Sequence, residues 1–238
     1  MTLAATDRLV SLFARAFLGV TVVADGEWGQ RPFDFHVPLG SLPRYLRKTR
    51  SAFPLDTRFL VPIRRRRLRW ATRPRQAFGP GLLKVGICWR SGLVEGLCPT
   101  ARSSPGVRSS GCRTCTSSTC STTSCCGDRR RPEDLRVTIH RWPKENLRDD
   151  LESVAGLLWN LDAVVTAPTA VSSLAGAAGV RTFELDNGGD WTAHGEERSP
   201  WFSSIRIVRR PYGTSDWAPC VEQVARELVR LGGEVMVG

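Results

Sequence analysis

The stretch VVTAPTAVSSLAGAAG, residues 164–179, decides the fold. Its β-branched start is typical of a buried strand, and Pro168 stiffens the turn that follows. Thr169 then stands where a helix N-cap is expected, and Gly179 stands where a helix stops. The stretch therefore predicts a strand, a turn and a helix in immediate succession.

Similar elements are expected on both sides of this stretch. Strands are predicted at residues 82–89, 137–140, 181–185 and 205–208, and helices at 149–161 and 216–231. The expected caps are Asp149 or Asp150 for the first helix and Ser215 or Asp216 for the second, which should stop at Gly232. Because strands alternate with helices, right-handed crossovers give a parallel sheet covered by helices. We therefore expect an α/β fold, a Rossmann-like parallel sheet flanked by helices.

The N-terminal part of the chain shows a weaker pattern. Apolar residues at helical spacing predict a helix at 7–17, followed by a short strand at 20–23. Six prolines between residues 26 and 75 deny backbone donors and break regular elements. We interpret that segment as a connecting region with one short helix at 43–50.

A Ser/Thr/Cys-rich segment interrupts the α/β pattern. Thirteen of the 24 residues from 103 to 126 are Ser or Thr, and five are Cys. Such a composition cannot bury enough apolar area to offset its ordering entropy, so residues 97–133 are predicted to be disordered. Cys112 and Cys115 invite a zinc interpretation, but a second clean pair is lacking, so no metal site is expected. Without a visible signal peptide, disulfides are not expected either.

The charge of the chain is concentrated in one region. The net charge is +11, and residues 44–75 alone hold twelve bases against one acid. A run such as Arg64 to Arg67 suits a phosphate backbone, but no RNA-binding or helix-turn-helix pattern accompanies it. No stretch approaches the roughly 18 apolar residues of a membrane span, and no secretory signal is visible. We therefore expect neither a nucleic-acid partner nor a membrane span, and a cytoplasmic location.

Two loops are placed to carry chemistry, because ligands of open parallel sheets bind beyond the carboxyl ends of the strands. The first is Arg90-Ser91-Gly92, directly after the strand predicted at 82–89. Ser91 and Gly92 offer hydroxyl and backbone donors to a phosphate, and Arg90 offers a forked cation. The alternative is an ordinary exposed turn.

The second loop is Pro168-Thr169-Ala170, between a strand and a helix of small residues. The first free amides of that helix point at whatever lies beyond the strand, which suits an anion. The alternative is a helix capped by Thr169 without any ligand. The two loops together predict a phosphate-receiving edge.

Four motifs carry a resemblance to a known family. They are PLGSLPR at 38–44, VGICWRSG at 85–92, VTAPTAVSSLAGAAG at 165–179, and residues 190–209. Together they resemble the C-terminal half of bacterial glycosyltransferases linked to tetratricopeptide repeats. Those proteins are similar in turn to heptosyltransferases and O-linked N-acetylglucosamine transferases, whose GT-B fold has two Rossmann-like halves.

The resemblance implies a division of the chain and a ligand. By this resemblance, residues 77–238 are expected to form a nucleotide-sugar-binding domain. Residues 1–76 are then a remnant of the N-terminal domain with its linker. The donor diphosphate is expected near Arg90, Ser91 and Thr169. No separate cofactor is implied, and the acceptor, protein or glycan, stays open.

The same resemblance implies a donor loop and leaves other roles open. Asp190 and Trp191 match the family's loop pattern, and His194 is a further donor-loop candidate because it lies in the same loop. Trp201 and Phe202 match the pattern too, but packing is their favoured role. Heptosyltransferases usually have Asp and His where this chain has Pro168 and Ser173, so the donor stays unidentified, and no catalytic residue is assigned.

Departures from the family suggest a damaged reading frame. The family's acceptor site and base lie in an N-terminal half of which this chain shows only the last part. Residues 63–76 and 97–131 resemble another frame of a GC-rich gene. We therefore expect a truncated glycosyltransferase with impaired or no catalysis. A nucleotide-binding or interaction remnant is the first alternative and a basic nucleic-acid binder the weaker one.

Overall fold

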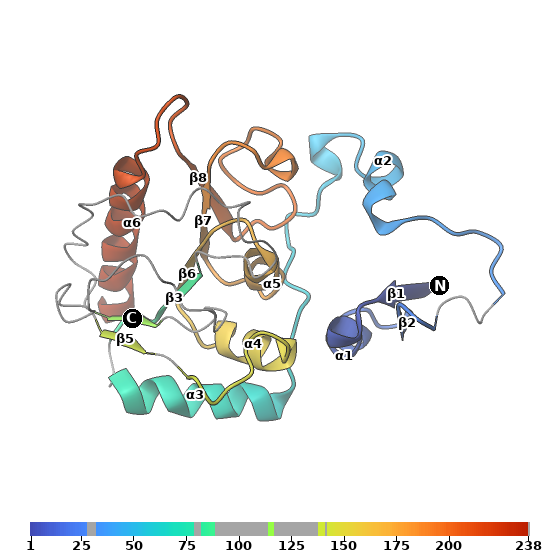
Figure 1. Cartoon of the computed structure of the whole chain (residues 1–238), viewed down its shortest axis with the longest axis horizontal. Helices are drawn as coiled ribbons and strands as arrows, with labels where there is room; N and C mark the ends of the chain where they lie inside the picture. Colours follow the sequence, from blue (N-terminus) through green and yellow to red (C-terminus); the bar gives the residue numbers. More distant parts are fainter. Residues whose placement is uncertain (28–31, 79–81, 89–113, 117–137, 141, 238) are drawn as a thin grey trace.

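The computed structural model describes residues 1–27, 32–78, 82–88, 114–116, 138–140 and 142–237. Its centre is a six-stranded parallel sheet with the spatial order β5-β4-β3-β6-β7-β8 (Figure 1). The strands are β3 (Val85–Cys88), β4 (Thr114–Thr116), β5 (Thr138–His140), β6 (Ala163–Thr166), β7 (Thr182–Asp186) and β8 (Ile205–Arg209). The predicted α/β fold is confirmed.

The strand order reverses between β3 and β6. From β3 the sheet grows outward to β4 and β5, and from β6 it grows the other way to β7 and β8. The last residues of the two central strands, Cys88 and Thr166, are directly paired. Beyond them, the amide of Ala167 donates to the carbonyl of Cys88 at 2.9 Å. The loops that leave β3 and β6 therefore start side by side at the switch point of the sheet.

Helices cover both faces of the sheet, with α6 on one side and α4 and α5 on the other (Figure 1). The helices are α3 (Arg64–Phe78), α4 (Leu151–Leu158), α5 (Ala170–Ala177) and α6 (Ala218–Val237). Neighbouring residues of β6 serve opposite cores. Val164 packs in the cluster of α4 and α5, whereas Ala163 packs with Val224 and Leu228 of α6. This alternation is the two-residue period of a strand that is buried on both faces.

The predicted start of α4 and the predicted stop of α5 are confirmed. Asp150 caps α4, because its carboxylate accepts from the amide of Ser153 at 2.9 Å. After α5, Gly179 adopts φ +71°, a conformation that glycine reaches without steric cost. These short-range signals set the ends of both helices on this face of the sheet.

The predicted end of α6 at Gly232 is wrong. Asp216 accepts from the amide of Ala218 at 2.9 Å, as expected of a capping residue, but the helix continues through both glycines to Val237. Leu231 is buried in the α6 core at the foot of this extension. Glycine inside a helix costs only about 1 kcal/mol relative to alanine. The buried Leu231 holds this turn in place, so the helix tolerates that cost.

The N-terminal unit consists of β1 (Thr2–Ala5), α1 (Asp7–Ala16) and β2 (Thr21–Ala24), with the two strands parallel. The predicted helix and second strand are confirmed, whereas β1 was not predicted because TLAA lacks a strong strand signal. Leu12 of α1 is fully buried in the core of α4 and α5. Ser11 donates to Glu152 of α4 at 2.8 Å, so the unit is attached to the larger sheet domain through α4.

Short helical turns lie between the N-terminal unit and α3. They are η2 (Leu39–Ser41), α2 (Pro43–Leu46) and η3 (Arg50–Ala52). The helix predicted at 43–50 is therefore confirmed in its first half. Beyond η3 the backbone runs past the end of α5, where the amides of Phe59 and Leu60 both donate to the carbonyl of Ala177, at 3.0 and 2.9 Å.

The interpretation of residues 26–75 as a connecting region is wrong for α3. This helix begins at Arg64 and packs along α4, with Trp70 fully buried against Trp142 at a ring distance of 5.2 Å. Arginine has a high helix propensity, and here the charge of the helix is matched by carboxylates distant in sequence. Arg69 and Arg73 both bind Glu145, at 2.6 and 2.7 Å. Residues 63–76 therefore pack as part of the fold. This packing argues against the hypothesis that they are translated from another reading frame.

Within the segment predicted to be disordered, 97–133, the structure describes Thr114–Thr116. These residues form β4, which pairs in parallel with β3 on one side and β5 on the other. Two β-branched threonines suit a strand, and pairing on both sides satisfies the backbone. The remainder of the predicted disordered segment lies outside the described residues.

Trp70 tests whether α3 belongs to the core. Trp70→Ala is expected to lower the free energy of unfolding by about 3–5 kcal/mol, because it empties a fully buried aromatic site. The matched control is Leu68→Ala on the same helix, whose side chain is 54% exposed and whose loss should cost about 0.5 kcal/mol. Urea denaturation followed by circular dichroism measures both. Equal effects of the two variants would show that α3 is not packed as described.

Candidate functional site

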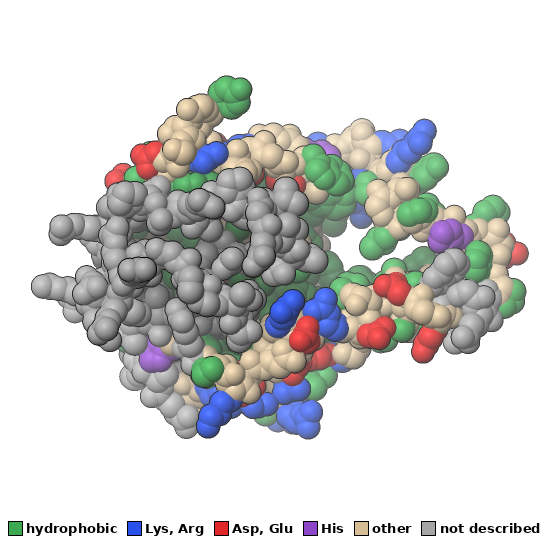
Figure 2. Space-filling view, viewed as in Figure 1, with side chains coloured by type: hydrophobic (Ala, Val, Ile, Leu, Met, Phe, Trp, Pro, Cys, Tyr) green, Lys and Arg blue, Asp and Glu red, His purple; other side chains and the backbone are tan. Residues whose placement is uncertain are grey.

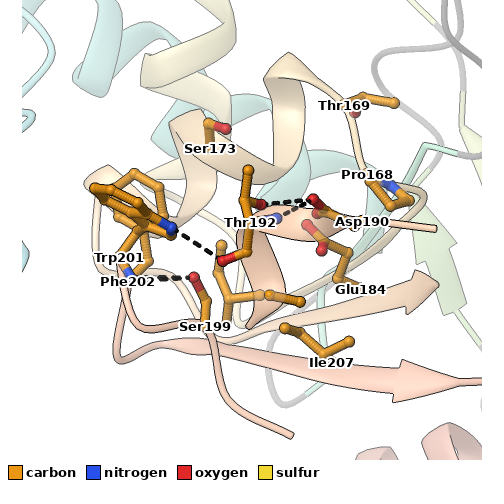
Figure 3. Close-up of a pocket in the computed structure, with 12 residues that line it drawn as sticks. Pro168, Thr169, Ser173, Glu184, Asp190, Thr192, Ser199, Trp201, Phe202 and Ile207 are labelled. Atoms are coloured by element: carbon orange, nitrogen blue, oxygen red, sulfur yellow. Dashed lines mark hydrogen bonds between the residues drawn. The ribbon is translucent and has the colours of Figure 1, made fainter. Parts of the chain in front are cut away.

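A pocket of about 470 Å³ opens beside the N-terminus of α5 (Figure 3). Its walls come from the turn before α5, from β7 and β8, and from the segment between these two strands. The polar lining consists of Thr169, Ser173, Glu184, Asp190, Thr192 and Ser199, and the apolar lining includes Pro168, Trp201, Phe202 and Ile207. The pocket therefore lies next to the switch point, on the face of the sheet that α5 covers.

The start of α5 differs from the predicted capped helix. Thr169 occupies the N-cap position with extended backbone, but its hydroxyl makes no capping bond and lies 3.4 Å from the hydroxyl of Thr166. The amide of Ser173 donates to the Thr169 carbonyl at 3.3 Å. The earlier amides of an α-helix have no partner within the helix. The first turn of α5 is thus left without a side-chain cap at the carboxyl edge of the sheet.

The predicted phosphate-binding residues fall into two groups. Pro168 and Thr169 line the pocket, and Ala170 is the exposed first residue of α5. Arg90, Ser91 and Gly92 lie outside the described residues. The strand that precedes them ends at Cys88, paired with Thr166 at the end of β6.

Glu184 is a pocket residue that the sequence analysis did not identify. It lies in the middle of β7, is 7% exposed, and accepts a hydrogen bond from the hydroxyl of Ser172 on α5. Burial raises the pKa of this carboxyl, the Ser172 hydrogen bond opposes the shift, and the carboxylates of Asp190 and Asp186 add to it. A single acid inside the apolar run of the strand was the available signal, because an unpaired acid is rarely buried.

Asp186, two residues further along β7, has a different environment. It is 1% exposed and forms an ion pair with Arg209 of β8 at 3.2 Å. Its carboxylate also accepts from the amide of Gly188 at 2.9 Å. Asp186 therefore has a structural role, fixing the start of the segment that leads from β7 to β8.

The predicted donor loop is only partly at the pocket. Asp190 lines it and accepts from both the amide and the hydroxyl of Thr192, at 2.8 and 2.6 Å, which starts the short helix η6 (Trp191–Ala193). Trp191 is 79% exposed and is not part of the lining. His194 follows in the left-handed conformation, with its ring 5.8 Å from that of Phe53. The structure thus brings Asp190 to the pocket and leaves Trp191 and His194 outside its lining.

Trp201 and Phe202 both pack and line the pocket. The indole of Trp201 donates to the carbonyl of Thr192 at 3.0 Å and meets Phe53 edge-on at 4.9 Å. The hydroxyl of Ser199 accepts from the amides of Trp201 and Phe202, at 3.2 and 3.3 Å. The favoured packing role is therefore present, and the same packing holds an aromatic wall in the pocket.

Two other classes of site were searched for in the described part of the chain. No group of three or more His, Cys, Asp or Glu side chains there is arranged to hold a metal ion. Cys112 and Cys120 of the zinc interpretation lie outside the described residues. None of the described helices combines the length and the apolar character required to span a bilayer.

The fold and the pocket define a class of structure, an open parallel α/β sheet with a cavity at its carboxyl edge. No family model matches the chain. The chain is similar to Protein FlbA of Caulobacter vibrioides (strain ATCC 19089 / CIP 103742 / CB 15), with 30% identity over an alignment 260 residues long. The alignment covers 96% of this chain and 41% of FlbA, so the chain spans about two-fifths of that relative's length.

The raised pKa of Glu184 predicts a pH-dependent stability difference. An unfolded glutamate ionises near pH ~4.3, whereas folding holds the Glu184 proton to higher pH. Above that pH the unfolded chain binds fewer protons than the native one, so the native state loses stability as pH rises. Glu184→Gln removes this loss. The variant should therefore gain stability relative to the parent from about pH 4 upward, until the folded carboxyl also ionises.

Urea denaturation at a series of pH values measures this difference. Glu197→Gln is the control for loss of a carboxylate, because Glu197 is exposed and does not line the pocket. A Glu184→Gln difference that stays constant with pH would contradict the described burial of Glu184.

Proposed function

We propose that the chain binds a nucleotide-sugar donor at the edge of the sheet between β3 and β6, as the donor-binding half of a GT-B type glycosyltransferase. One observation carries the proposal. The two motif loops, at 89–92 and 167–170, leave adjacent strands whose last residues, Cys88 and Thr166, are paired. In doubly wound sheets this switch point is where nucleotides bind.

The contrast between α4 and α5 supports an anion at this edge. Both helices lie on the same face of the sheet, yet α4 is capped by Asp150 and α5 has no side-chain cap. An uncapped helix N-terminus presents free amides and the positive end of the helix dipole, which favour a phosphate. Arg90 is the residue that the sequence suggests for the remaining diphosphate charge.

The adjoining pocket supports a ligand larger than a free phosphate. Its volume of about 470 Å³ lies within the range of small-molecule sites. Hydroxyls of Thr169 and Ser173 lie on the α5 side of it (Figure 3). A donor with its diphosphate at the start of α5 would have room there for an attached ring.

The proposed reaction is transfer of the sugar to an acceptor. A hydroxyl of the acceptor attacks the anomeric carbon and releases its proton to solvent, the bond from that carbon to the diphosphate oxygen breaks, and the nucleoside diphosphate leaves with the electron pair. Helix amides and a cation stabilise the charge on the leaving group. We assign no catalytic base, and binding without turnover is the alternative from another class of function.

The structure gives less support to a nucleic-acid-binding function. Several bases of residues 44–75 are engaged in packing on α4 rather than free at the surface. Arg66 pairs with Asp150 at 2.7 Å, and the guanidinium groups of Arg58 and Arg67 lie over the ring of Trp159, at 4.3 and 5.1 Å. These contacts use positive charge that a phosphate backbone would need.

Calorimetric titration with UDP-glucose, GDP-mannose and ADP-glucose tests the proposal. Saturable binding of at least one donor is expected. Arg90→Ala should weaken it by about 1–3 kcal/mol, the value of a charge-assisted hydrogen bond. Arg65→Ala is the matched control, because Arg65 is an exposed arginine of α3.

The outcomes separate the alternatives. Release of nucleoside diphosphate from the bound donor supports the enzyme, and binding without release supports the non-catalytic module. Absence of binding to all three donors would contradict both, and equal losses in the two arginine variants would remove Arg90 from the site.

A further inference from the structure

The charge of the pocket lining restricts what it can hold. Glu184 and Asp190 contribute carboxylates, and the described residues that line the pocket include no lysine or arginine. A phosphate placed among these side chains would meet like charge without a cation. The pocket and the phosphate-binding edge at the start of α5 are therefore suited to different parts of a ligand.

Glu184 is the side chain whose position lacks a structural explanation. The next inward acid of the same strand, Asp186, is buried to a similar degree and is balanced by Arg209 at 3.2 Å. In the part of the chain that the structure describes, no lysine or arginine pairs with Glu184, and its one side-chain bond joins Oε2 to the hydroxyl of Ser172. Glu184 lines the pocket, where its carboxylate lies near the side chain of Asp190 (Figure 3).

The other walls of the pocket favour a ring with hydroxyl groups. Trp201 and Phe202 supply an aromatic surface, on which the C–H face of a sugar ring packs. Ser199 accepts from two backbone amides and keeps its own proton to donate. The pocket thus offers hydrogen-bond acceptors at its floor, a hydroxyl donor at its side and an aromatic wall. These groups complement a polar ring with apolar faces.

We infer that this pocket is a subsite for a neutral, polyhydroxylated ring, recognised by a hydrogen bond from a ring hydroxyl to Glu184. The inference rests on the proposed function, in which the ring is a sugar of the donor. The phosphates then lie outside the pocket, towards the start of α5 and the β3–β6 edge. Glu184 is the specificity-determining residue of the subsite and takes no part in bond making.

Saturation-transfer NMR with monosaccharides tests the subsite without the nucleotide. The probes are the neutral methyl glycosides of glucose, galactose, mannose and N-acetylglucosamine, together with ribose, the methyl glycoside of glucuronic acid and glucosamine. At least one neutral ring is expected to bind saturably and more tightly than the anionic and cationic probes. Stronger binding of the glucuronic acid glycoside, or of protonated glucosamine, would overturn the inference.

Two variants locate the binding. Glu184→Gln keeps the shape of the side chain and an acceptor for Ser172, and should weaken binding of the neutral ring about fivefold or more, because a neutral acceptor replaces a charged one. Ser173→Trp should block the pocket from α5, since Ser173 is an exposed residue of its lining. Glu197→Gln, outside the lining, is the control and should bind like the parent. Unchanged binding in both pocket variants would overturn the inference.

The same variants separate this inference from the donor proposal. If neutral rings bind through Glu184 and no nucleotide sugar binds, the donor proposal fails and the subsite stands. If nucleotide sugars bind and Glu184→Gln changes neither their affinity nor that of the neutral rings, the subsite fails and the donor proposal stands. Affinity for UDP, GDP and ADP without a sugar should be the same in Glu184→Gln and in the parent, provided that the sugar is the ring in the pocket.

Discussion

The parallel pairing of β3 with β6 is the constraint on which the rest of the structure depends. It places Cys88 beside Thr166, and the bond from Ala167 to the Cys88 carbonyl extends the pairing into the turn. Because the sheet grows in opposite directions from these two strands, the turn before α5 borders an open crevice rather than another crossover. The first turn of α5, which has no side-chain cap, begins at this position (Figure 1).

Beside that crevice, the structure separates opposite electrostatic environments over a short distance. Helix amides at the start of α5 favour an anion, whereas Glu184 and Asp190 disfavour one in the adjoining pocket. The ion pair of Asp186 with Arg209 fixes the segment that carries Asp190. On the visible face of the molecule, acidic and basic side chains lie among one another around the N-terminal unit, and basic side chains gather at the lower edge, where α3 runs (Figure 2). A ligand with a charged and a neutral part fits this arrangement better than a uniformly anionic polymer.

Local signals explain what could be predicted from the sequence. The sequence predicts strand β6, helix α5 and the stop at Gly179, because the residues that determine them are close together in the chain. The cap of α4 by Asp150 is determined just as locally. Helix α3 was missed because the partner of its arginines, Glu145, is more than seventy positions away. The pocket was missed for the same reason: Glu184 becomes a site residue only when α5 and β7 bring Ser172 and Glu184 together.

The central claim is that a nucleotide diphosphate binds at the start of α5. The most direct measurement is a ¹H–¹⁵N correlation spectrum of the labelled chain during titration with UDP, GDP and ADP. The account predicts the largest shifts at the amides of Ala167 and of residues 169–173, with smaller changes along α3. Shifts concentrated on the amides of Arg64 to Arg69, or the absence of saturable shifts with all three nucleotides, would contradict it.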